Sequence, residues 1–277
     1  MTDTQTVDAT KRIDLSFTEN ELDAHREHIT QFIRDQVRAA GVEGAVLGLS
    51  GGIDSTLTAH LAVEALGKEN VHGLVLPSEV NAADNMSDAE RVAQLLEIEY
   101  DVIEINPIVD AFLAAVPEAK DDQLAAGNVR VRTRAVLNYL VANHESRLVL
   151  GTGNRSEALV GYFTKYGDGA VDCHPIANLY KGQVRQLARH IGVPEDLAAK
   201  TATAGMWVGQ TDEEEMGVPY DTLDQVLALY IDGPLTKAQT MTALGVSESV
   251  VDRIDELYTN SEHKRNIPPG PAPLSSL

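Results

Sequence analysis

The sequence predicts a single α/β domain in which helices cover both faces of a doubly wound parallel sheet, giving three layers. Short apolar segments with strand character alternate with longer segments of helical periodicity along most of the 277 residues. An apolar content of 43% supports a core of ordinary size. A glycine-rich turn joins the first strand to the helix that follows, and parallel sheets bind their ligands beyond the carboxyl ends of such strands.

The expected elements follow this alternation. A helix begins near Thr18, with apolar residues every three or four positions up to Val37. Strands are expected at 45–49, 71–76, 100–105 and 147–150. Further helices are expected at 81–96, 107–116, 121–143, 181–190, 220–231, 236–244 and 248–259, with Ser247 as the cap of the last one.

The domain is expected to span residues 17–267, between a polar N-terminal tail (1–16) and a proline-rich C-terminal tail (268–277). Within it, segment 200–219 is irregular and rich in glycine, threonine and acidic residues, so we expect a mobile lid there.

The composition excludes several classes of function. The chain carries 42 acidic and 22 basic residues, a net charge of −20, and such a field repels nucleic acid and anionic membranes. A role in tRNA modification is therefore disfavoured. The excess of acidic residues resembles that of proteins from salt-loving microbes. The lone Cys173 cannot form an internal disulfide, and no apolar run reaches membrane-spanning length, so the expected location is cytoplasmic.

The stretch AVLGLSGGIDS, residues 45–55, predicts a phosphate site. Its turn points backbone N–H groups outward, and the helix that starts there adds partial positive charge. Asp54 is a hard oxygen ligand placed where a magnesium ion would accompany the phosphate, and Ser50 and Ser55 add hydroxyl groups. No lysine follows the glycines, so the stretch is not a GxxxxGK[ST] loop. The alternative is an ordinary glycine turn before a capped helix.

Charged residues elsewhere are candidates for the same ligand. Arg130, Arg132 and Arg134 form a basic cluster in GNVRVRTR, although only the first and last share a helix face. Glu157 follows a strand end and is a possible second magnesium ligand. Lys165 and Lys181 are suited to phosphates, and Asp168 sits between two glycines in a turn. On composition alone, a turn residue or surface charge is the favoured interpretation of Glu157, Lys165, Lys181 and Asp168, whereas for the arginine cluster the two interpretations are evenly balanced.

Longer stretches resemble known families. SGGIDS is similar to the ATP pyrophosphatase loop of the adenine nucleotide alpha-hydrolase-like superfamily, whose members cleave ATP between its α and β phosphates. The stretch LGTGNRSEALVGYFTKYGDGAVDCHPIANLYKGQVRQLA, together with NVRVRTR, KTATAG, TDEEEMGVPYDTLD and EHKRNIPP, resembles the NAD synthetase family over about 16–269. No large glutamine amidase region accompanies these motifs, so the resemblance is to the ammonia-dependent form.

The resemblance implies a ligase that needs Mg²⁺ and uses ATP, deamido-NAD and ammonia. The pyridine carboxylate of deamido-NAD attacks the α phosphorus of ATP, and ammonia then displaces AMP from the acyl adenylate to give NAD. The family is also homodimeric, with the dinucleotide bound near or across the interface.

The same resemblance assigns residues to each ligand. Those matched to ATP are Gly48, Leu49, Ser50, Gly51, Gly52, Ile53, Asp54, Ser55, Thr152, Lys181 and Thr203. Those matched to deamido-NAD are Arg132, Lys165, Asp172, His263 and Lys264. Asp54 and Glu157 are matched to magnesium. Asp54, Lys181 and Asp168 are the expected catalytic residues, with Asp168 holding ammonium and helping to deprotonate it.

The sequence departs from the family's motifs at two places, and two alternative functions stay open. GTGNRSE replaces the family's common GTDHAAE but keeps Thr152 and Glu157 in place. KTATAG lacks the usual proline before Thr203. Another ATP pyrophosphatase, such as the synthetase half of GMP synthetase, would use xanthylate as acceptor. A nucleotide-binding regulator would bind ATP without releasing pyrophosphate.

Overall fold

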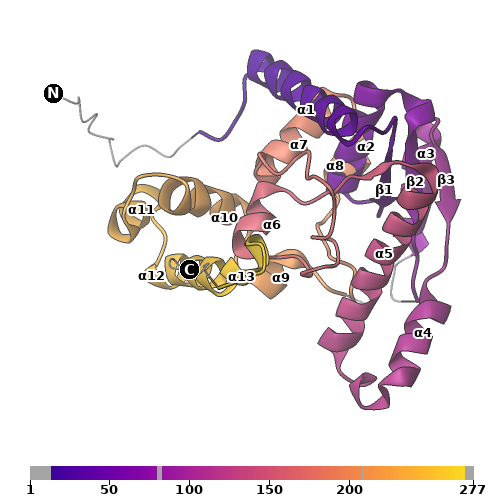
Figure 1. Cartoon of the computed structure of the whole chain (residues 1–277). Coiled ribbons are helices and arrows are strands. Elements are labelled where there is room, and N and C mark those ends of the chain that lie inside the picture. The colour runs from indigo at the N-terminus through magenta and orange to yellow at the C-terminus, as the bar shows by residue number, and fades with distance from the viewer. Residues whose placement is uncertain (1–13, 80–82, 208, 272–277) are drawn as a thin grey trace, which may run out of the picture.

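The fold was analysed in a computed structural model that describes residues 14–79, 83–207 and 209–271 (Figure 1). Most of both expected tails lies outside these residues. The strands are β1 (Ala45–Leu49), β2 (Val71–Val75), β3 (Glu99–Val102) and β4 (Leu148–Val149). The helices up to β4 are α1 (Glu19–Ala40), α2 (Ile53–Leu66), α3 (Ala83–Leu95), α4 (Asn106–Ala115) and α5 (Gln123–Glu145). Those after β4 are α6 (Arg155–Val160), α7 (Lys181–His190), α8 (Glu195–Ala198), α9 (Asp212–Met216), α10 (Tyr220–Val226), α11 (Lys237–Leu244), α12 (Glu248–Asn260) and α13 (Glu262–Arg265).

The sheet is parallel, with strand order β3-β2-β1-β4. From β1 the chain moves outward to β2 and β3, and it then returns to pair β4 on the other side of β1. The order therefore reverses between β1 and β4. Their following loops diverge there and leave a crevice at the carboxyl edge, which is where open α/β sheets bind ligands.

Helices cover both faces of the sheet, which confirms the expected three-layer arrangement. Ala45, Leu47 and Leu49 of β1 point to one face, where they pack in a core cluster with residues of α1, α2, α3 and α7. Val46 points to the other face and packs with residues of α4 and α5. Period-two alternation thus buries both sides of β1, as expected for a central parallel strand.

The last four helices, α10 to α13, form a smaller group beside the end of α6, seen in orange and yellow in Figure 1. A separate core cluster holds them together, with Val160 of α6 packed against Tyr220, Leu223, Val251 and Ile254. This group supplies side chains to the site described below. No helix in the described part of the chain is both long enough and apolar enough to cross a membrane.

The differences from the expected boundaries have local causes. The third strand ends at Val102, three residues early, although Ile103 N–H still donates to Val75 O at 2.9 Å. Ser247 precedes α12 as expected but makes no capping bond, because its hydroxyl pairs with Ser249 Oγ instead. Part of the expected lid is helical, since α9 occupies Asp212–Met216. Helix α6 was not expected, because its six residues are too few to show a periodic pattern.

Candidate active site

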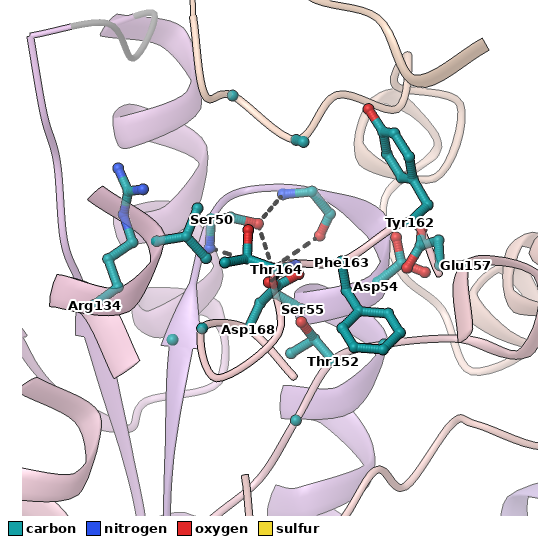
Figure 2. A pocket seen from close by; sticks show the side chains of 18 of the residues that line it. Ser50, Asp54, Ser55, Arg134, Thr152, Glu157, Tyr162, Phe163, Thr164 and Asp168 are labelled. Atoms are coloured by element: carbon teal, nitrogen blue, oxygen red, sulfur yellow. Dashed lines mark hydrogen bonds between the residues drawn. The ribbon is translucent and has the colours of Figure 1, made fainter. Parts of the chain in front are cut away.

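The turn after β1 is held in place by its own hydroxyl groups. Gly51 has φ +73°, a left-handed conformation that favours glycine. Ser55 Oγ accepts from Ser50 N–H at 3.3 Å and donates to Gly52 O at 3.1 Å, and Ser50 Oγ accepts from Gly52 N–H at 3.2 Å. Figure 2 shows these bonds at the centre of the pocket. The turn thereby sets the N-terminal end of α2, where anions bind.

A buried lysine lies between two carboxylates at the edge of this turn. Lys181 Nζ is 2.5 Å from Asp54 Oδ2 and 3.0 Å from Glu157 Oε1, and its side chain is 2% exposed. Burial alone would lower the pKa of Lys181, but the two carboxylates outweigh burial and raise it. Burial raises the pKa of Glu157 to about 7, although Lys181 opposes this shift. The lysine stays charged at neutral pH, next to the turn after β1.

Two unexpected residues, Asn154 and Tyr220, contact these carboxylates, and a third, Asp212, contacts Tyr220. Asn154 is fully buried; its Nδ2 donates to Asp54 Oδ1 at 2.8 Å, and its Oδ1 accepts from Glu157 N–H at 3.0 Å. Tyr220 Oη lies 3.2 Å from Glu157 Oε1 and 3.1 Å from Asp212 Oδ2. The N-cap position of Asn154 before a helix was a signal available in the sequence. Nothing local pointed to Tyr220 or Asp212, because their contacts are long-range.

A cavity of about 770 Å³ opens at the carboxyl edge of the sheet and brings most of the predicted residues together. Its volume falls within the usual range of ligand sites. Figure 2 shows Asp54 and Glu157 on one side and Arg134 on the other. The predicted residues that line the cavity are Gly48, Leu49, Ser50, Gly52, Ile53, Asp54, Ser55, Arg132, Thr152, Glu157, Lys165, Asp168, Lys181, Thr203, His263 and Lys264.

A second group of cations lines the same cavity. Arg132 Nη2 donates to Lys165 O at 3.2 Å, and Lys165 Nζ donates to His263 O at 2.6 Å. Lys264 Nζ donates to Gly161 O at 2.8 Å, and burial lowers its pKa. These side chains come from α5, α13 and the loop after α6, so the fold gathers positive charge in a strongly acidic chain.

Asp168 lies close to this basic group. Its Oδ1 accepts from Thr164 N–H at 2.7 Å, which fixes the carboxylate at the cavity wall. Loss of water raises the pKa of Asp168, while Thr164 N–H and, more weakly, Lys264 and Arg134 oppose the shift. Arg134 itself donates to Leu76 O at 3.0 Å. Asp168 is exposed at this wall, so a ligand in the cavity can reach its carboxylate.

Two predicted residues do not line the cavity. Gly51 is buried beneath the turn that it shapes. Asp172 is exposed outside the cavity, where its Oδ2 accepts from Val149 N–H at 2.8 Å and its Oδ1 accepts from Tyr139 Oη at 3.2 Å. The contact of Asp172 with deamido-NAD remains a prediction.

Fold and site together define a class: an α/β protein that binds a phosphate-bearing ligand at the switch point of a parallel sheet, beside a lysine and two carboxylates. Comparison with known proteins gives the family. Residues 25–268 match the family model described as NAD synthase. A protein from Halobacterium salinarum named NH(3)-dependent NAD(+) synthetase is 57% identical over 264 residues, covering 95% of this chain and 98% of the relative. The chain belongs to the NAD synthase family and is therefore a ligase that forms a carbon–nitrogen bond.

Solved structures agree with this assignment. An NH3-dependent NAD synthetase from Campylobacter jejuni has a TM-score of 0.75 and 30% identity, covering 92% of this chain and 100% of the other. An NMN synthetase from Francisella tularensis has a TM-score of 0.80 and 36% identity, covering 92% and 99%.

Proposed function

We propose that the chain catalyses the ATP-dependent amidation of deamido-NAD with ammonia, giving NAD, AMP and pyrophosphate through an acyl adenylate. One observation carries the proposal: a single cavity is lined both by the turn after β1 with Lys181 and by a separate group of basic side chains. Such a cavity suits two phosphate-bearing substrates. The relatives that match nearly the whole chain are named as ammonia-dependent NAD synthetases.

The turn after β1 and Lys181, here called the phosphate end of the cavity, suit the first step, in which the carboxylate attacks ATP. An oxygen of the pyridine carboxylate forms a bond to the α phosphorus of ATP, and the bond to the bridging oxygen breaks as pyrophosphate leaves. Backbone N–H groups of the turn and the Lys181 ammonium would stabilise the charge on that leaving group. Thr152 and Thr203, both at the cavity wall, would bind ATP alongside them.

We propose that Asp54 and Glu157 hold Mg²⁺ when ATP is bound. In the described residues, no cluster of three or more His, Cys, Asp or Glu side chains is arranged to cage a metal. Two carboxylates fit Mg²⁺ nevertheless, because that ion keeps several waters and shares substrate phosphates. When bound, Mg²⁺ would neutralise part of the triphosphate charge. Lys181 bridges the same two carboxylates in this structure, so it would turn toward the phosphates.

The second group of cations suits the acceptor, deamido-NAD. Arg132, Lys165, His263 and Lys264 would bind deamido-NAD, with its pyridine carboxylate directed at the α phosphate. Asp168 would hold ammonium and accept a proton from it. The ammonia nitrogen then bonds to the acyl carbon, and the bond from that carbon to the AMP oxygen breaks. The exposed carboxylate of Asp168 at the cavity wall supports this role.

We also propose a homodimer that pairs the α4–α5 surface of two copies. Five large apolar side chains, each 47% or more exposed, lie on or next to these helices: Phe112, Val116, Leu124, Val136 and Leu140. Leu124 also lines the cavity, so this surface adjoins the site. An exposed apolar surface of this kind is typical of a protein interface. The substrates and the single cysteine favour a cytoplasmic location.

One assay tests the function. Purified chain with ATP, Mg²⁺, ammonium and deamido-NAD should form NAD and AMP in equal amounts. Separate reactions with nicotinate mononucleotide and with xanthylate test the acceptors that an NMN synthetase or a GMP synthetase would use. Faster amidation of either would overturn the proposed acceptor, and ATP binding without AMP release would indicate a regulator. Glutamine should not replace ammonium.

A variant tests the phosphate end separately. Asp54→Ala should abolish pyrophosphate release while the protein stays folded, because the carboxylate proposed to hold magnesium is gone. Unchanged turnover would contradict the role of Asp54. Circular dichroism checks that the variant is folded.

A further inference from the structure

Helix α10 presents two buried polar side chains to the Lys181–Glu157 pair, although neither side chain belongs to a proposed ligand contact. Tyr220 and Asp224 are 0% and 3% exposed. They are four positions apart, so they lie on one face of the helix. A carboxylate this deeply buried is costly unless it is fully bonded, so its partners indicate what it does.

Asp224 joins the two segments that carry the site. Ser156 Oγ donates to Asp224 Oδ1 at 2.5 Å, and Gly182 N–H donates to Oδ2 at 2.8 Å. Ser156 Oγ in turn accepts from Lys181 N–H at 3.0 Å. Ser156 immediately precedes Glu157, and Gly182 immediately follows Lys181. One carboxylate therefore fixes the backbone beside both functional residues.

Tyr220 acts on the side chains of the same two residues. Its hydroxyl lies 3.2 Å from Glu157 Oε1, and its ring centroid lies 5.0 Å from Lys181 Nζ, a cation–π distance. The backbone is thus held by Asp224 and the side chains by Tyr220, both from one turn of α10.

The site needs such a support because of how it is built. Helix α6 has only six residues, and a helix this short has little stability of its own. Glu157 and Lys181 are separated by 23 residues with no helix between α6 and α7, so no regular element fixes their separation. Contacts from α10 supply that constraint.

We propose that the Tyr220–Asp224 face of α10 is a positioning surface that sets the distance between Glu157 and Lys181 for ATP. This rests on the proposed role of those two residues at the phosphate end. Asp224 is a positioning residue and not a catalytic one, because it acts through Ser156 and Gly182.

The test compares Asp224→Asn, Ser156→Ala and the double variant in the full-length protein. Asp221→Asn is the matched control, since it makes the same change at an exposed position of the same helix. We would measure kcat and KM for ATP and for deamido-NAD well below each variant's Tm. For Asp224→Asn we expect kcat/KM for ATP to fall roughly ten- to a hundredfold, because Glu157 and Lys181 would no longer be held in the geometry that ATP needs. KM for deamido-NAD should stay within about twofold, because the bonds of Asp224 and Ser156 involve none of its proposed contacts.

The double variant separates positioning from general stability. Since Asp224 acts partly through Ser156, the effects on ATP kinetics should be less than additive. If Asp224→Asn does not fold, Ser156→Ala alone must show the selective loss with ATP. The inference is overturned by full additivity, by equal losses for both substrates, or by unchanged kinetics with only a lower Tm.

These outcomes differ from a failure of the proposed function. If the unmodified protein makes no NAD, the function is wrong. If Lys181→Met leaves ATP kinetics intact, the role of the pair is wrong. Normal ATP kinetics in Asp224→Asn, with both of those tests passed, would refute only the positioning role.

Discussion

Replacing Lys181 by methionine tests whether the buried lysine is the cation that holds the phosphate end together. The substitution keeps the length of the side chain but leaves Asp54 and Glu157, at 2.5 and 3.0 Å from the former ammonium, without a counter-charge. Removing one partner of a buried ion pair costs about 3–5 kcal/mol, because the remaining charge stays buried and unpaired. We expect a loss of this size in the free energy of unfolding at pH 8.

The loss should depend on pH. The pKa of Glu157 is already raised to about 7 by burial, and removing Lys181 raises it further. A carboxyl group with a raised pKa in the folded state stabilises that state at low pH, and this contribution is lost as pH rises through the folded pKa. Lys181→Met should therefore be closer to wild type at pH 5 than at pH 8.

Urea unfolding at the two pH values, with NAD formation measured in parallel, gives both readouts. Lys237→Met is the matched control, because Lys237 also bridges two carboxylates, Glu248 and Asp252, but on the surface. Exposed pairs contribute little, so the control should change neither stability nor activity much. The reasoning is refuted if Lys181→Met unfolds like Lys237→Met, or if it keeps full NAD synthesis.

Three further changes test other parts of the molecule. Because the pKa of Glu157 is raised from 4.5 to about 7 in the folded protein, Glu157 takes up a proton on folding at any pH between these values. Relative to Glu157→Gln, the free energy of unfolding of the wild type should therefore fall with rising pH by up to about 1.4 kcal/mol per pH unit over this range. A pH dependence that is the same in both proteins would contradict this. A Cβ at Gly151 would lie 2.4 Å from His174 Nδ1, so Gly151→Ala should cost about 1–3 kcal/mol, and adding His174→Ala should restore part of it in thermal unfolding. Leu140→Glu places a charge on the proposed α4–α5 dimer surface and should give a monomer by light scattering, whereas an unchanged dimer would exclude this surface.

The sequence was sufficient wherever the signal was local. The alternation of apolar segments predicted all four strands and the layer order, because the central β1 must be apolar on both faces. The turn after β1 was predicted as an anion site from contiguous residues, and the structure places its backbone at the cavity. Helix α7 was predicted with its observed bounds, Lys181–His190.

The resemblance to a family indicated which residues, far apart in the sequence, bind the substrates, but it did not indicate which of them contact one another. Lys181 was expected to bind ATP, yet its pairing with Asp54, 127 positions away, came from the structure. Tyr220 and Asp224 carried no signal that would have linked them to that pair.

What the sequence determined by itself was the alternation of strands and helices and the glycine turn after the first strand, since each depends on neighbours along the chain. Tertiary structure alone decided that a buried lysine would lie between two carboxylates and that α10 would support both. A charge is tolerated in a protein interior only when partners surround it, and here those partners come from α2, α6, α7 and α10. Such contacts depend on how distant elements pack, which no local pattern specifies.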